Sequence, residues 1–379
     1  MRLKVFREAF TIFFIGIIGS LGAGFLLSGM SSTLVAVPGL ALLLPGILGA
    51  RGTIHGSLGS KLSSLMHLGV IDHFAWDNEL IRQNAALTHK ASLFISLVLA
   101  FIASGLAKVA GIPVNPFLLF FVSVVSGFLA GIILIILTNT IAFQAFRHGW
   151  DPDNVTAPLI ATLGDFVTVP ILFGVALVAL RLPQAFLIAI FILASGYIIY
   201  ETRGYFLTPR FFILLVSISF QVFAGFFLEN SIAILLMTPG ILIFLPALLA
   251  QGGNLSSFIA SRLATQLHLG TLRPEFIIRG RVVNEMLIVA LLSLFIFPFL
   301  GTTAFLLQEV LAIPHMSFFR IIQITLEAGF LTTLLVAIVL GFSVSIISWR
   351  LNLDPDDVTI PILSAVADLF GILFLLLVI

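Results

Sequence analysis

The chain has 379 residues, of which 60% are hydrophobic and only 9% are charged. A water-soluble domain of this length cannot bury so much apolar surface, so the composition excludes a soluble globular protein. The net charge of +1 excludes a nucleic-acid-binding protein. The absence of cysteine excludes disulfides, thiolate metal sites and cysteine nucleophiles. We therefore expect an integral membrane protein.

Long apolar stretches predict an all-α polytopic membrane protein, because a helix of about 20 apolar residues crosses a bilayer. In chain order we expect about eleven spans, at residues 8–30, 33–68, 88–110, 115–146, 155–180, 184–200, 211–229, 231–268, 281–307, 316–348 and 358–378. They predict a first five-helix repeat, a connecting transmembrane helix and a second five-helix repeat, at residues 1–183, 184–205 and 206–379.

The two halves share motifs at a nearly constant separation. Three motifs return 201 residues later: Pro38-Gly39, Ser60-Lys61-Leu62 and His67-Leu68-Gly69 recur as Pro239-Gly240, Ser261-Arg262-Leu263 and His268-Leu269-Gly270. Two more return 203 residues later: Asp151-Pro152-Asp153 and Asp165 recur as Asp354-Pro355-Asp356 and Asp368. Proline, glycine and aspartate are unfavourable inside apolar helices, so their return in register indicates a duplicated helical unit.

The connecting helix determines how the two copies are oriented. A direct fusion of two five-span units would invert the second copy, and one added span restores its orientation. We therefore expect parallel repeats related by a pseudo-two-fold axis along the membrane normal. With the N-terminus inside, 14 Lys and Arg residues lie near the cytoplasmic face and three lie opposite, at Lys108, Arg181 and Arg320. The positive-inside rule then predicts a cell-membrane protein with a cytoplasmic N-terminus and an external C-terminus.

The second span of each repeat is expected to be interrupted. Residues 31–69 form one stretch of 39 residues, which as a straight helix would be roughly 58 Å long, about twice the thickness of the hydrocarbon core. Proline and glycine supply the break points, at Pro38, Pro45, Gly46, Gly49 and Gly52 in the first copy and at Pro239, Gly240, Pro246, Gly252 and Gly253 in the second. Freed backbone must be buried in protein or face water. Either such residues line a pore, or the glycines only allow close helix packing; the pore-lining candidates are Gly52, Thr53, Gly252, Gly253 and Asn254.

The fifth span of each repeat carries acidic residues at two levels. Asp151 and Asp354 stand at helix starts, where they either cap the helix or gather cations at the cytoplasmic mouth. Asp165 and Asp368 follow fourteen residues later, about 21 Å along the helix and inside the bilayer. An isolated aspartate there costs at least ~2.5–3.5 kcal/mol. Either each acid is protonated or paired with a cation such as Arg51, or the two together bind one divalent cation.

The candidate ligands are all oxygen atoms, from carboxylates, Asn and Thr side chains and backbone carbonyls. Oxygen ligands favour Mg²⁺, Ca²⁺ or Mn²⁺ over Zn²⁺ or Cu²⁺. Two carboxylates are too few for Ca²⁺, which takes roughly six to eight oxygens, but they suit Mg²⁺, which keeps most of its water. We therefore expect a partly hydrated Mg²⁺ as the transported ion, with Mn²⁺ and Co²⁺ left open.

The second half resembles the membrane domain of MgtE-type magnesium transporters in Pro246-Ala247-Leu248, Gly252-Gly253-Asn254, Ser261-Arg262-Leu263, Asp354-Pro355-Asp356, Pro361 and Asp368. The duplicated, fused chain is similar to solute carrier family 41. The resemblance covers nearly the whole chain except residues 184–200. It implies a transporter rather than an enzyme, with a pore between the repeats and Mg²⁺ held by Asp165 and Asp368. It further implies carbonyl ligands from Ala161 and Ser364 and mouth acids at Asp151 and Asp354.

The two copies are unequal at several positions. Where the second copy has Gly252, the first has Arg51, a cation within a membrane span. Arg51 gates the pore, pairs with an acid, or points away into the protein. Glu327 has no acidic counterpart in the first half; it either pairs with Arg320 or binds a proton or a sodium ion. These differences leave open an exchanger coupled to Na⁺ or H⁺.

Another class of function is an intramembrane aspartyl protease, because Gly164-Asp165 and Pro246-Ala247-Leu248 echo motifs of presenilin-like enzymes. The match is incomplete, since Thr162 stands where that motif has glycine and Ala367 precedes the second aspartate. In the transporter interpretation, one chain holds both halves of the pore. A single chain in the lipid bilayer should then act as a pseudo-dimer on its divalent cation substrate, without further oligomerisation.

Overall fold

The computed structural model describes residues 2–71, 77–148, 152–203, 209–238, 240–278, 280–314 and 316–379. Every element among these residues is a helix, which confirms the predicted all-α class. Nine of the described helices are long and apolar enough to cross a membrane, which confirms a polytopic membrane protein. Two further helices, α1 (Arg2–Gly29) and α3 (Leu40–His67), lie at predicted spans. The total of about eleven spans remains a prediction.

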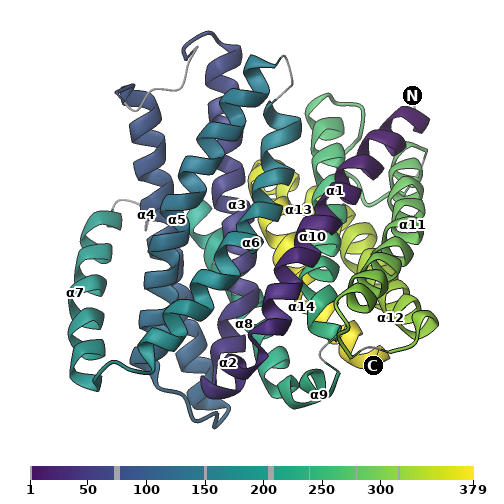
Figure 1. Cartoon of the computed structure of the whole chain (residues 1–379). Coiled ribbons are helices and arrows are strands. Elements are labelled where there is room, and N and C mark those ends of the chain that lie inside the picture. Colours follow the sequence, from purple (N-terminus) through teal and green to yellow (C-terminus); the bar gives the residue numbers. More distant parts are fainter. Residues whose placement is uncertain are drawn as a thin grey trace. The chain divides into compact units, whose positions relative to one another are not determined.

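The chain forms two compact units, which are residues 29–207 and residues 1–28 together with 208–379. The first unit contains α2 (Ser31–Ala36), α3, α4 (Glu79–Val109), α5 (Pro116–Arg147), α6 (Pro152–Ala179) and α7 (Gln184–Thr202). Helix α3 packs against α4, α5 and α6 and is the central helix of this unit (Figure 1). Its first turns are buried on every side, from Leu40 to Ile47, as expected for a helix that is apolar all round.

Helix α7 corresponds to the predicted connecting span. It packs against α4 and α5 and lies at the edge of the unit beside α4 (Figure 1). Only a few of its side chains are buried, among them Leu187 and Ile198. An apolar helix with so much exposed surface is suited to contact with lipid on most of its sides.

The second unit contains α1, α8 (Pro209–Asn230), α9 (Ile232–Met237), α10 (Gly240–His268), α11 (Arg281–Val310), α12 (Phe318–Thr332), the π-helix η1 (Thr333–Leu340), α13 (Gly341–Arg350) and α14 (Pro355–Val378). Helix α10 packs against α11, α13, α14 and η1, and α14 also packs against α8. The order of helices from α8 to α14 follows that from α1 to α6. The exact boundaries of the two repeats remain a prediction.

The N-terminal helix α1 packs into the second unit. Phe13 contacts Phe258 of α10 edge to face, and Phe14 stacks on Phe299 of α11 with ring centroids 4.2 Å apart. Further along α1, a methyl group at Gly24 would lie 1.8 Å from the carbonyl oxygen of Ile243. Only a glycine allows this close approach of two helix backbones. A helix from the start of the sequence thus completes a unit built mainly from its end.

The second span of each repeat is interrupted, as predicted, but at one place only. In the first copy, α2 ends at Ala36 and α3 begins at Leu40, with Gly39 between them at a φ of 87° that favours glycine. In the second copy, α9 ends at Met237 and α10 begins at Gly240. Pro45 and Pro246 lie inside continuous helices. The additional break points expected at these prolines and at the following glycines are therefore wrong.

The fourth span of the second copy contains one additional residue. The span begins 202 residues after its counterpart (318 − 116) and ends 203 residues after it (350 − 147). The extra residue is accommodated in η1, where the helix widens to π geometry between α12 and α13. A one-residue insertion in an α-helix would otherwise rotate all following side chains to another face. The π-helix accounts for the last step of the offset, from 202 to 203 residues, within this span.

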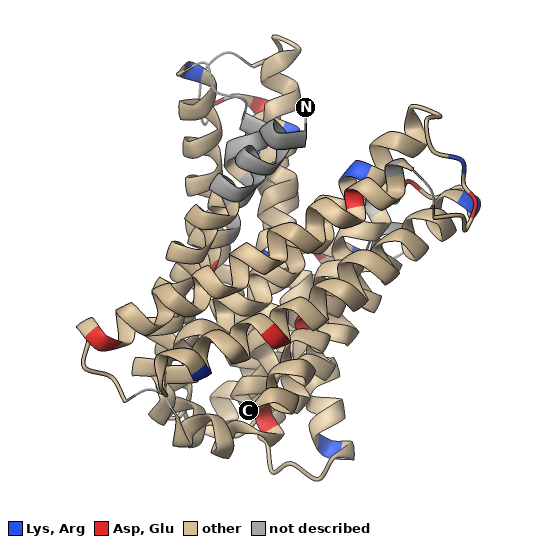
Figure 2. Ribbon diagram, turned by 90° about the vertical axis from the view of Figure 1, so that its right-hand side faces the viewer, with Lys and Arg blue, Asp and Glu red and all other residues tan. Residues whose placement is uncertain are grey.

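Charged residues gather toward the ends of the helices. Figure 2 shows Lys and Arg mostly near helix ends and only a few acidic residues along the middle of the helices. Two salt bridges lie near such ends, Arg82 with Glu79 and Arg262 with Glu285. This distribution matches the predicted spans, because charges are costly in the hydrocarbon core.

Candidate functional site

Asp165 lies thirteen residues after the start of α6 and is 9% exposed. The preceding residue, Gly164, faces α3 and α5, since a methyl group there would be 3.6 Å from Arg51 Cβ and 3.9 Å from Leu134 Cδ1. A methyl group at position 164 would therefore make ordinary contacts with α3 and α5 just before the acid. The sequence prediction of a buried carboxyl deep in this helix is consistent with its low exposure.

Arg51 is almost completely buried in α3, at 2% exposure. Its guanidinium group donates hydrogen bonds to the hydroxyls of Ser92 and Ser96 on α4, the second at 3.2 Å. The backbone carbonyl of Arg51 lies 3.1 Å from Nδ1 of His55, one turn later. Of the three alternatives for this arginine, the contacts favour a side chain that points into its own half of the protein.

Asp368 lies thirteen residues after the start of α14 and is 7% exposed. Gln221 of α8 donates a hydrogen bond from its side-chain amide to Oδ2 of Asp368, over 3.4 Å. Gln221 is itself buried, at 4% exposure. A neutral amide donor of this kind supports a carboxylate without neutralising its charge. The carboxyl of α14 is therefore held from one side within the second unit.

The glycine pair of α10 packs directly on α14. A methyl group at Gly253 would lie 2.9 Å from Oγ of Ser364, and one at Gly252 would lie 3.2 Å from Thr332 and 3.8 Å from Ala367. The two glycines thus bring α10 close to the segment of α14 that precedes Asp368. The carbonyl of Gly252 accepts a hydrogen bond from Ser256 within a continuous helix. The contacts support the close-packing interpretation of these glycines.

The other predicted residues lie at several places in the two units. Thr53 donates a hydrogen bond to the carbonyl of Gly49 over 3.2 Å, and Gly52 and Asn254 are half-buried. Asp354 is exposed at the start of α14 and lies 3.4 Å from Nε2 of His268. Asp151 lies outside the described residues, and the side chain of Ala161 does too.

Glu327 does not pair directly with Arg320 in the structure. Arg320 donates a hydrogen bond to Gln323 over 3.0 Å, and Gln323 donates one to Glu327 over 2.9 Å. Arg320 also donates to the carbonyls of Val378 and Ile379 at the end of α14. An amide therefore links the arginine to the acid along one exposed face of α12.

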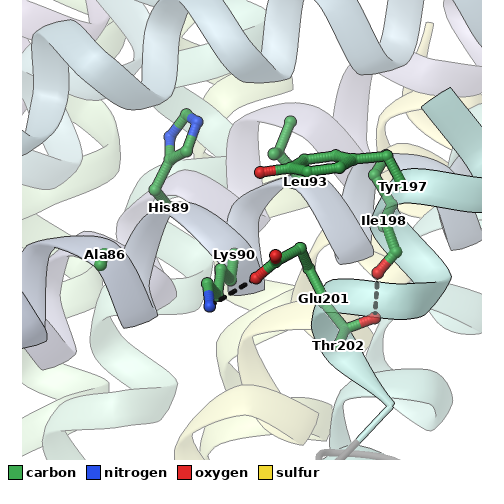
Figure 3. A pocket seen from close by; sticks show the side chains of 8 residues that line it. All are labelled: Ala86, His89, Lys90, Leu93, Tyr197, Ile198, Glu201 and Thr202. Carbon is green, nitrogen blue, oxygen red and sulfur yellow. Dashed lines mark hydrogen bonds and ion pairs between the residues drawn. The ribbon is translucent and has the colours of Figure 1, made fainter.

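Within the described residues, no group of three or more His, Asp or Glu side chains gathers in a way that would hold a metal ion. A cavity of about 210 Å³ lies between α4 and α7, lined among others by His89, Lys90, Tyr197 and Glu201 (Figure 3). Lys90 forms an ion pair with Glu201 at 2.6 Å. These partners neutralise each other, so the cavity presents no net charge to attract a divalent cation.

Sequence reasoning missed two buried amides, one of which contacts a candidate acid. Gln221 contacts Asp368 from α8, and Gln251 of α10 is fully buried with both atoms of its amide unpaired among the described residues. The available signal was the rarity of amides in strongly apolar helices, since a buried polar group normally has a partner. The contact of Gln221 with Asp368 depends on helix packing, which the sequence pattern does not specify.

Comparison with known proteins assigns the family. The profile of MgtE, described as a divalent cation transporter, matches residues 44–175 and 245–378, one segment in each half. Solute carrier family 41 member 3 of Mus musculus is 27% identical over an alignment of 369 positions, which covers 88% of this chain and 73% of that protein. Solute carrier family 41 member 2 of Xenopus laevis is 28% identical over an alignment of 362 positions, which covers 87% of this chain and 63% of that protein.

Solute carrier family 41 member 2 of Homo sapiens is 25% identical over an alignment of 376 positions, which covers 87% of this chain and 62% of that protein. The chain thus spans less than two thirds of the length of these two member 2 proteins. No solved structure matches the chain at a significant level. The two matched segments together cover more than half of the sequence, and on that basis the chain belongs to the MgtE family of divalent cation transporters.

Proposed function

We propose that the chain carries Mg²⁺ across the membrane along a path between its two repeats. In this proposal a partly hydrated ion is held by Asp165 and Asp368. The observation that carries it is the matched placement of the two carboxyls. Each lies thirteen residues into the last helix of its repeat and is less than a tenth exposed.

Charge supports a divalent rather than a monovalent substrate. One carboxylate from each repeat gives a charge of −2, which a single Mg²⁺ neutralises. Two acids are also about the number that Mg²⁺ needs, because it keeps several of its water molecules and is often bound through one or two carboxylates. The family description as a divalent cation transporter agrees with this charge balance.

The remaining predicted ligands have supporting roles in the proposal. The carbonyls of Ala161 and Ser364 and the mouth acids Asp151 and Asp354 would contact the ion or its water on the way to the paired aspartates. Gly52, Thr53, Gly252, Gly253 and Asn254 would border the path. An exchanger coupled to Na⁺ or H⁺ would use the same site, and flux measured with and without those gradients separates it from a channel.

The test is Mg²⁺ uptake into liposomes that contain the purified protein. We expect Asp165→Asn and Asp368→Asn each to lower initial uptake by at least about 100-fold, because a carboxylate about 4 Å from a cation contributes about 4 kcal/mol per unit charge at an effective dielectric constant near 20. The matched control is Glu79→Gln, which removes an exposed acid in the first turn of α4 and should leave uptake unchanged.

Two outcomes would contradict the proposal. Normal uptake by the double variant Asp165→Asn/Asp368→Asn would show that the ion does not depend on these acids. If uptake occurred only when two copies of the chain formed a dimer, that result would argue against a path contained in each chain. We expect single chains, reconstituted at less than one per vesicle, to transport.

A further inference from the structure

Arg51 is a buried cation without an acidic partner among the described residues. Its guanidinium group donates only to hydroxyls, those of Ser92 and Ser96, and its Nε has no partner. The neighbouring ionisable groups are His55 on α3 and His89 on α4, neither of which is acidic. Breaking or omitting the counter-charge of a buried ion is strongly destabilising. A charge kept at this depth therefore indicates a function.

The first unit is shaped around the guanidinium group of Arg51. On α5, a methyl group at Gly127 would lie 2.9 Å from Nη2 of Arg51 and 2.1 Å from Oγ of Ser96. Glycine at this position leaves the space that the guanidinium fills. We call Ser92, Ser96 and Gly127 the arginine socket. The fit indicates that these contacts fix the side chain of Arg51, which therefore does not extend freely into a pore.

The second unit fills the equivalent space with apolar atoms. Ser92–Ile95 and Ser293–Ile296 both read Ser-Leu-Phe-Ile, so Ser96 corresponds to Phe297. Gly127-Phe128-Leu129 likewise corresponds to Gly329-Phe330-Leu331. A methyl group at Gly329 would lie 2.2 Å from the ring of Phe297. A phenylalanine thus packs on the glycine of α12 where the first unit has an arginine and a serine.

This substitution shows that packing does not require a cation. Gly252 replaces Arg51 in the second unit, and the Phe297 ring supplies the volume there. The first unit instead retains a charge that must be desolvated, at a site whose packing an apolar ring satisfies in the other copy. Arg51 Cβ also lies beside Gly164, the residue before Asp165. The arginine that carries this charge therefore begins, at its Cβ, beside the helix segment that carries one of the two acids, and its guanidinium is anchored on α4.

We propose that Arg51 is an affinity-determining residue, a fixed positive charge that weakens the binding of divalent cations at the intramembrane acids. This inference rests on the proposed function of Asp165 and Asp368. A transport site must attract its ion but also release it. Two carboxylates in a low-dielectric environment bind a divalent ion strongly, and a nearby anchored guanidinium repels the same ion and shortens its stay.

The test is Mg²⁺ binding by calorimetry together with Mg²⁺ uptake, in the full chain. A unit charge about 10 Å from a divalent ion, at an effective dielectric constant near 20, changes its binding by at least about tenfold. We expect Arg51→Gln to bind Mg²⁺ at least about tenfold more tightly and to transport more slowly at saturation. Arg51→Lys keeps the charge and should bind as the unchanged protein does.

A second variant separates the charge from the packing. The double variant Arg51→Gly/Ser96→Phe gives the first unit the residues that the second has at Gly252 and Phe297, packed on Gly127 of α5, a glycine that both repeats share. It removes the charge while replacing the lost volume, and we expect it also to bind Mg²⁺ more tightly. The control is Arg82→Gln, which removes an exposed cation of α4 and should leave the affinity unchanged.

The outcomes distinguish this inference from the proposed function. If Asp165→Asn/Asp368→Asn abolishes Mg²⁺ binding while Arg51→Gln and the double variant bind as the unchanged protein does, the acids form the site and the role of Arg51 is refuted. If Asp165→Asn/Asp368→Asn still binds Mg²⁺ as the unchanged protein does, the proposed site itself is wrong. Weaker binding by Arg51→Gln than by Arg51→Lys would also overturn the inference.

Discussion

The packing of α1 into the second unit predicts that Gly24→Ala destabilises the protein, and one distance sets the magnitude of this loss. In Gly24→Ala, the added methyl carbon would lie 1.8 Å from the carbonyl oxygen of Ile243, whereas carbon and oxygen in weak contact are about 3.3 Å apart. The oxygen belongs to the backbone of α10 and cannot rotate away. The two helices must separate by more than 1 Å, which also loosens the contacts of Phe13 and Phe14.

Overpacking of a well-packed contact typically costs about 1–3 kcal/mol. We expect about 3 kcal/mol for Gly24→Ala, since neither backbone can rearrange locally. The assay is reversible unfolding in detergent, followed by the fluorescence of the protein, together with Mg²⁺ uptake. The control is Gly29→Ala at the end of the same helix, where a methyl group meets nothing within 4 Å. Equal stability of the two variants would refute the packing of α1 on α10.

Two further predictions concern buried polar contacts. Gln221→Leu should weaken Mg²⁺ binding by about fivefold in calorimetry, because a long hydrogen bond to the carboxyl of Asp368 contributes about 1 kcal/mol; unchanged affinity would remove Gln221 from the site. Glu285→Gln should destabilise the fold by about 2 kcal/mol in detergent unfolding, because it leaves the charge of the half-buried Arg262 without its acid. Adding Arg262→Gln should restore part of this loss, and a double variant no more stable than Glu285→Gln would contradict the pairing.

Much of the fold follows from patterns that are local in the sequence. The apolar runs predicted the helices, and the repeated proline and glycine predicted the interruption before α3 and α10. The exact break could not be predicted, because Pro45 and Pro246 are equally strong helix breakers in isolation. In the structure these prolines lie in helix segments buried on all sides, where packing compensates for one missing hydrogen bond.

The two acids of the candidate site could be predicted from the sequence, but the residues that surround them could not. Asp165 and Asp368 were found because an acid deep in an apolar helix is costly and these two recur in register. The socket of Arg51 and the contact of Gln221 with Asp368 depend on which faces of separate helices meet. Sequence offset alone does not give those faces, particularly after η1 shifts the register of the second copy by one residue.

The most direct test of the account is the position of a bound divalent cation. A structure of the protein determined with Mn²⁺, which is located by its anomalous scattering, would show whether one ion lies between Asp165 and Asp368. The account predicts a single strong peak within reach of both carboxyl groups, directly or through one water molecule, and its loss in Asp165→Asn/Asp368→Asn. A peak elsewhere, or two carboxyl groups too far apart to share an ion, would contradict it.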